Sequence, residues 1–101
     1  MFTGTEGAST KFDTSKIVIL PVPYDKTSTW VKGADKGPLA ILEASVQLEM
    51  YDIETGTVPA EYGIFTAPDV NCRTMSPEKM TKLVKKEVSK LISDKKFVVV
   101  L

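Results

Sequence analysis

Two unbroken apolar runs restrict the folds open to this chain more than any other feature. Residues 17–20, which follow Lys16, read Ile-Val-Ile-Leu, and residues 97–101 read Phe-Val-Val-Val-Leu. A strand with one solvated face alternates apolar and polar residues, and neither run does so. Continuous apolar runs are typical of strands in parallel sheets that carry helices on both faces. Burying one Val, Leu or Phe contributes roughly 1.5–3 kcal/mol, so we expect the final run to be covered by a partner.

Two helical patterns and a weaker strand lie between these runs. Apolar residues recur at helical spacing from Pro38 to Tyr51 and again from residue 77 to 93, where Ser76 supplies a hydroxyl cap. Residues 62–67 form the weaker strand, which Pro68 ends. The order strand, helix, strand, helix, strand predicts an α/β fold with a parallel sheet.

The two ends of the chain suggest how it is organised. Residues 1–15 are rich in Gly, Thr and Ser, which predicts a flexible tail or an arm that orders against another subunit. Residues 16–101 then form part of one α/β domain. In open α/β sheets, ligands bind beyond the carboxyl ends of the strands, and the chain ends where that crevice begins. We therefore expect residues 16–101 to be the N-terminal portion of a truncated domain, although a self-contained small sheet is an alternative.

Composition excludes several classes of function. The 101 residues carry 13 basic and 13 acidic side chains, so the net charge of zero gives no sign of a nucleic-acid partner. Seven lysines between Lys79 and Lys96 predict the solvated face of a helix. No apolar stretch is long enough to cross a membrane. The N-terminus lacks the basic and apolar regions of a signal peptide. The single cysteine excludes an internal disulfide, which favours a reducing, cytoplasmic location.

The chain has no histidine and one cysteine, Cys72. The lack of histidine removes the usual general base and the commonest transition-metal ligand. Cys72 has no basic partner that the sequence identifies, so a catalytic thiol is not expected.

The segment from 21 to 45 carries a family resemblance. It combines the turn Pro21-Val22-Pro23-Tyr24-Asp25, a Thr/Ser-rich stretch ending in Trp30, and the run Gly33-Ala34-Asp35-Lys36-Gly37-Pro38-Leu39-Ala40-Ile41-Leu42-Glu43-Ala44-Ser45. Together these resemble the N-terminal signature of the ureohydrolase (arginase/agmatinase) family, the agmatinase branch in particular. Val31 and Leu42 depart from it, because many agmatinases have arginine there.

The resemblance implies a three-layer α/β/α sandwich several-fold longer than this chain, with two manganese ions at its centre. Its metal motifs contain His and Asp residues that are absent here, and the first would begin just after Leu101. The implied reaction of the parent is hydrolysis of a guanidino C–N bond, most simply agmatine and water giving putrescine and urea. The resemblance also implies a homo-oligomer. This chain alone is then expected to be inactive, without catalytic or metal residues.

Three residues after the first strand are candidates for the rim of the parent's active site: Tyr24, Asp25 and Trp30. Acids such as Asp25, Asp52 and Asp69 are interpreted as turn or cap residues. Two other functions remain open. One is a ureohydrolase for arginine or formiminoglutamate. The other is a non-enzymatic module that uses its first and last strands as edges for partner binding or oligomer assembly.

Overall fold

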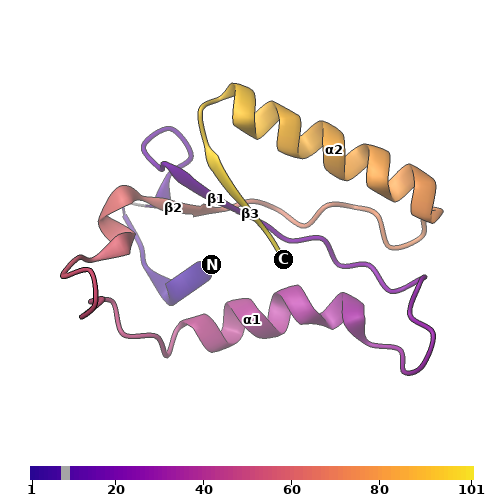
Figure 1. Ribbon diagram of the computed structural model, residues 1–101, viewed down its shortest axis with the longest axis horizontal. Helices are drawn as coiled ribbons and strands as arrows, with labels where there is room; N and C mark the ends of the chain where they lie inside the picture. Colours follow the sequence, from indigo (N-terminus) through magenta and orange to yellow (C-terminus); the bar gives the residue numbers. More distant parts are fainter. Residues whose placement is uncertain (8–9) are drawn as a thin grey trace.

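A three-stranded parallel sheet organises the molecule (Figure 1). The computed structural model describes residues 1–7 and 10–101. The strands are β1 (Ile17–Leu20), β2 (Ile64–Thr66) and β3 (Phe97–Val100), in the order β2-β1-β3. The α/β prediction with a parallel sheet is confirmed.

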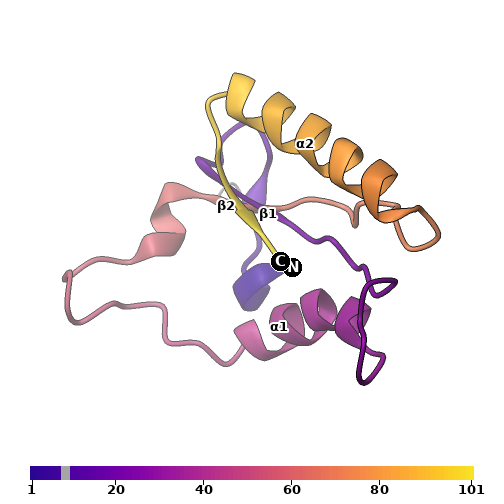
Figure 2. The same cartoon turned by 45° about the vertical axis from the view of Figure 1, so that its right-hand side comes forward.

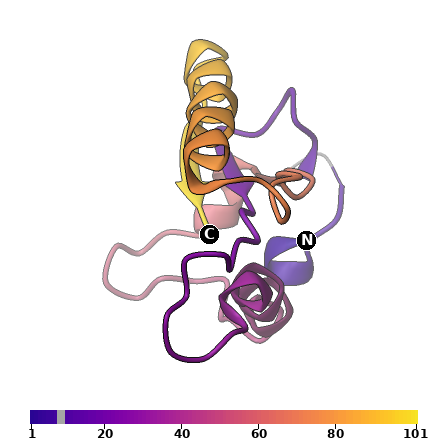
Figure 3. The same ribbon diagram turned by 90° about the vertical axis from the view of Figure 1, so that its right-hand side faces the viewer.

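Helices lie on both sides of this sheet (Figures 1 and 3). Helix α2 (Pro77–Ser93) covers one face, and α1 (Gly37–Ser45) lies on the other side. Short 3-10 turns complete the structure: η1 (Phe2–Gly4), η3 (Ala34–Lys36) and η4 (Pro59–Tyr62).

Helix α2 begins where the sequence predicts. The Ser76 hydroxyl accepts a hydrogen bond from the Lys79 backbone N–H at 3.3 Å, and Pro77 occupies the first turn. Its apolar face packs against the β1 core residues Val18 and Leu20, with Leu91 fully in that core. The long lysine-rich helix is therefore a one-sided amphipathic helix.

Helix α1 ends at Ser45, so the prediction that it continues to Tyr51 is wrong. The Ser45 hydroxyl donates to the Leu42 carbonyl at 2.6 Å and accepts from the Thr3 N–H at 2.8 Å. Ser hydroxyls that bond to helix carbonyls compete with the helical ladder. The chain then leaves the helix through a tight turn, in which the Gln47 N–H donates to the Ala44 carbonyl.

The second strand is shorter than the predicted 62–67, because η4 occupies its start and Gly63 follows in a left-handed conformation, at φ +77°. A side chain at Gly63 would place its Cβ 2.7 Å from the Ser15 Cα. Glycine is therefore required by both the backbone angle and the close approach of residue 15.

The strand covered on both faces is β1, whereas β3 is an edge strand. Val18, Ile19 and Leu20 are at most 4% exposed, whereas Phe97 is 70% exposed. Strand β3 has a neighbour on one side only, and α2 covers one of its faces. Within the described residues the final run is thus only partly covered, and its burial by a partner stays a prediction. The idea that the first strand is an edge is wrong, since the edges are β2 and β3.

The N-terminal residues that the structure describes lie against the rest of the chain. The Phe2 N–H donates to the Thr66 hydroxyl at 2.9 Å, so η1 sits between β2 and α1 (Figure 2). The Lys96 ammonium donates to the carbonyls of Phe12 and Ser15 at 2.6 and 2.7 Å. The role of residues 1–15 as an oligomer arm stays a prediction.

Candidate functional site

The candidate site is the loop that follows β1 at the carboxyl edge of the sheet, the edge at which α/β proteins bind ligands. Residues 23–36 contain the three predicted rim residues. Figure 1 shows this loop running outward from β1 and returning to the start of α1.

Asp25 holds the loop in shape. Its carboxylate accepts hydrogen bonds from the Ser28 hydroxyl and from the Gly33 N–H, the latter at 2.8 Å. These two hydrogen bonds lower the pKa of the Asp25 carboxyl from its ordinary value, and the bond from Ser28 has the larger effect. The Lys32 ammonium closes the same turn by donating to the carbonyls of Asp25 and Ser28, at 2.9 and 3.0 Å.

Tyr24 ties this loop to the segment that follows β2. Its hydroxyl donates a hydrogen bond to the Met75 carbonyl at 2.9 Å. The pKa of the Tyr24 phenol is raised, first by burial and second by the nearby Cys72. The Lys26 ammonium donates to the Thr74 carbonyl at 3.1 Å. Asp35 and Arg73 form an ion pair between the same two segments. Four polar side chains thus join the loops after β1 and β2.

Trp30 lies in the same loop and is 95% exposed. The structure therefore gives the three candidates different partners: Tyr24 contacts the neighbouring loop, Asp25 its own loop, and Trp30 the solvent. It does not bring them together into one cluster. Their role at the rim of an active site stays a prediction.

Cys72 lies beneath the joined loops and is 0% exposed. Its thiol points to the Pro23 carbonyl at a distance of 3.8 Å. Burial raises the pKa of the Cys72 thiol, which disfavours the thiolate. That Cys72 has no catalytic role stays a prediction.

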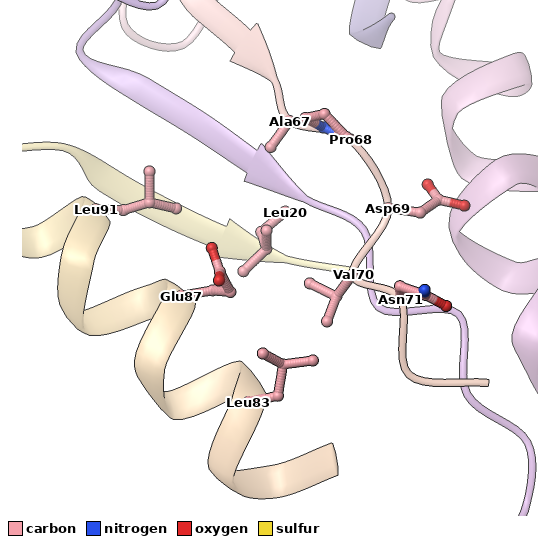
Figure 4. A pocket seen from close by; sticks show the side chains of 9 residues that line it. All are labelled: Leu20, Ala67, Pro68, Asp69, Val70, Asn71, Leu83, Glu87 and Leu91. Atoms are coloured by element: carbon pink, nitrogen blue, oxygen red, sulfur yellow. The ribbon is translucent and has the colours of Figure 1, made fainter. Parts of the chain in front are cut away.

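A pocket of about 360 Å³ lies between α2 and the segment that follows β2 (Figure 4). Its wall is mostly apolar, and the Glu87 carboxylate projects from α2 toward Leu20. Asp69 and Asn71 line its other end. This pocket was not predicted from the sequence. The available signal was Glu87, an acid that stands between Leu83 and Leu91 at helical spacing. The residues that line the pocket include two carboxylates, Glu87 and Asp69, but no basic side chain and no nucleophile, so we assign it no reaction.

The described residues do not provide a metal centre. Within residues 1–7 and 10–101, no three His, Cys, Asp or Glu side chains come together as a metal site requires. Asp25 and Asp52 use their carboxylates in loop hydrogen bonds, Asp52 with the Glu54 N–H and the Thr55 hydroxyl. The interpretation of these two acids as turn residues is confirmed. Within the same residues, no helix combines the length and apolar character needed to cross a bilayer.

Comparisons with known proteins agree with the sequence resemblance. Residues 15–101 match the Arginase family. The N(1)-aminopropylagmatine ureohydrolases of Synechocystis sp. and Thermus thermophilus are each 37% identical to this chain over 97 and 92 residues. The match covers 91% of this chain and 32% or 31% of those proteins. The agmatinase of Bacillus cereus is 31% identical over 86 residues, which cover 85% of this chain and 30% of that protein.

The fold has a close counterpart among solved structures. The crystal structure of the agmatine ureohydrolase of Thermoplasma volcanium superimposes with a TM-score of 0.83 and 26% sequence identity. The match covers 92% of this chain and 32% of that one. The chain thus spans about a third of the length of the relatives it matches. Since the family match covers most of its residues, the chain belongs to the arginase family.

Proposed function

We propose that the protein to which this chain belongs is a ureohydrolase that cleaves a guanidino C–N bond of an agmatine-like substrate and releases urea. The observation that carries the proposal is the family match over residues 15–101, together with the backbone likeness to an agmatine ureohydrolase. For agmatine the products are putrescine and urea.

This chain contributes the frame of the site. Its β1 strand and the joined loops form one wall of the carboxyl edge, held by the Tyr24, Lys26 and Asp35 contacts. The manganese pair that the family resemblance implies does not fit the residues described here, which lack a ligand cluster. We therefore derive no step through a metal from this chain and assign it no catalytic residue.

The relatives favour a refinement of the substrate. The two N(1)-aminopropylagmatine ureohydrolases are 37% identical to this chain, whereas the agmatinase is 31% identical. N(1)-aminopropylagmatine is agmatine extended by an aminopropyl group, so both substrates present the same guanidinium to the reacting centre. We propose the aminopropyl compound as a second candidate substrate beside agmatine.

The test is urea release by the purified protein, produced as its gene encodes it and incubated with Mn²⁺. Agmatine, N(1)-aminopropylagmatine, arginine and formiminoglutamate are compared at equal concentrations. The proposal expects turnover of one or both agmatine compounds. Turnover of arginine or formiminoglutamate alone would replace the substrate assignment, and no turnover of any of the four would overturn the proposed activity.

Sequencing of the reading frame past codon 101 is an independent test. The proposal expects a continuation with the His- and Asp-containing metal motifs of the family. A continuation without them contradicts the proposed enzyme, whatever the assay conditions.

A further inference from the structure

The pocket between α2 and the segment that follows β2 has an apolar wall that is already in place (Figure 4). Leu20, Val70 and Leu91 line the pocket, belong to the core between α2 and the sheet, and are at most 9% exposed. Because core side chains are closely packed, they hold their positions whether or not a ligand is bound. The volume of about 360 Å³ lies in the range of small-molecule sites.

One carboxylate, that of Glu87, stands within this apolar wall. Leu83, Glu87 and Leu91 follow one another at steps of four residues, which places them on the same side of α2. That side faces the sheet, whereas the lysines of α2 are exposed. The Glu87 side chain is half-buried and projects toward Leu20 (Figure 4). Within the part of the chain that the structure describes, its carboxylate accepts no hydrogen bond and forms no ion pair.

The lining residues exclude most classes of ligand. They include no basic side chain, and Asp69 adds a second negative charge, so an anion is repelled. An uncharged ligand would cover the Glu87 carboxylate without pairing it, which costs free energy. A metal ion needs several ligand atoms, and no described cluster of three His, Cys, Asp or Glu side chains offers them. The class that fits is an organic cation with an apolar body.

We propose that this pocket binds a primary alkylammonium ion, with its ammonium group on the Glu87 carboxylate and its carbon chain along Leu83 and Leu91. An ammonium group donates three hydrogen bonds, and bonds to a carboxylate are among the strong ones. The carbon chain removes apolar wall from water, which favours binding. This inference concerns binding alone and does not rest on the proposed enzyme activity.

The experiment follows the leucine methyl NMR signals of the protein, produced as its gene encodes it, while hexylamine hydrochloride is added at neutral pH. The signals of Leu83 and Leu91 are expected to shift, with a Kd on the order of 1 mM. Those of Leu39 and Leu48 are expected to stay in place, because these residues lie on α1 and on the turn after it, on the other side of the sheet.

Three further probes separate the contributions of charge and chain. Hexan-1-ol and hexanoate have the same number of carbon atoms without the positive charge, and each is expected to bind at least about fivefold more weakly than hexylamine. Propylamine keeps the charge but has three fewer methylene groups, and it is expected to bind about tenfold or more weakly.

Two variants, Glu87→Gln and Asp69→Asn, each remove one negative charge from the lining. Asp69→Asn is the matched control, because the Asp69 carboxylate points away from α2 (Figure 4). Glu87→Gln is expected to weaken hexylamine binding about fivefold to tenfold and to leave hexan-1-ol binding unchanged. Asp69→Asn is expected to change hexylamine binding less than about twofold.

Four results would each overturn the proposal. The first is the absence of any shift of the Leu83 and Leu91 signals at about 50 mM hexylamine. The second is a shift confined to other leucines, which would place the amine elsewhere. The third is equal binding of hexylamine and hexan-1-ol, and the fourth is equal weakening by Glu87→Gln and Asp69→Asn.

Discussion

Gly63 offers the sharpest test of the packing between the N-terminal segment and the sheet. Its φ of +77° lies in the left-handed region, and a Cβ there would lie 2.7 Å from the Ser15 Cα and 3.0 Å from the Thr14 carbonyl oxygen. Both neighbours are backbone atoms, so no side-chain rotation relieves the contact. The substitution Gly63→Ala therefore combines backbone strain with a steric clash.

The two contributions have separate magnitudes. A left-handed conformation costs an L-residue about 1–2 kcal/mol, and the lower entropy of the unfolded chain returns about 0.4–1 kcal/mol to an alanine variant. Forced displacement of packed atoms adds about 1–3 kcal/mol. We expect Gly63→Ala to lower the free energy of unfolding by about 2–4 kcal/mol.

Gly56→Ala is the matched control. Gly56 has φ +64°, but the nearest atom to a Cβ at this position would be the Tyr51 hydroxyl oxygen at 3.7 Å, an ordinary contact. This variant carries the strain without the clash and is expected to lose about 1 kcal/mol. Urea unfolding followed by circular dichroism measures both variants against the wild type. Equal losses for the two variants would refute the argument that residue 15 packs against Gly63.

The remaining predictions concern single side chains. Ser76→Ala removes the cap of α2 and is expected to lower the free energy of unfolding by about 1 kcal/mol in urea titrations. Lys96→Met removes two hydrogen bonds to backbone carbonyls and is expected to cost about 2 kcal/mol in the same assay; a neutral result contradicts the contact with the N-terminal segment. The lowered pKa of Asp25 means that its stabilising effect is complete above the ordinary aspartate pKa and is lost as pH falls through the lowered value. The stability difference between wild type and Asp25→Asn is therefore expected to shrink as urea midpoints are measured at progressively lower pH below about 4. The buried thiol of Cys72 is expected to react with a disulfide reagent about 1000-fold more slowly in the native than in the unfolded chain.

The sequence predicted helices and strands well where the type of a single residue determines where an element begins or ends. Ser76 and the following proline determine where α2 begins, and the β-branched run before Pro21 gives β1. The end of α1 was not predictable from spacing, because the apolar pattern continues past Ser45. Its end coincides with a hydroxyl that bonds to Leu42 and Thr3, and the second contact joins residues 42 positions apart.

The candidate site shows a similar division. The sequence placed Tyr24, Asp25 and Trp30 after β1, because parallel strands direct the following loops to one edge. It did not predict the hydrogen bond from Tyr24 to Met75, which is 51 residues away, because the sequence around neither residue indicates a contact over that separation. The burial of β1 and exposure of β3 also depended on strand order, which a list of apolar runs does not contain.

The carboxylates of this segment fit the frame role that we propose for it. Asp25 accepts two hydrogen bonds within its loop, Asp35 pairs with Arg73, and Asp52 binds the turn that follows it. A metal ion or a substrate cation would have to displace these partners, and displacing those of Asp25 or Asp52 would also open the loop that positions the acid. The bonds of Asp25 and Asp35 thus hold the loops at the carboxyl edge, and those of Asp52 hold the turn that precedes η4, so all three acids are occupied. Rigid loops of this kind position side chains supplied by other strands, which is the part that we assign to this chain in a ureohydrolase.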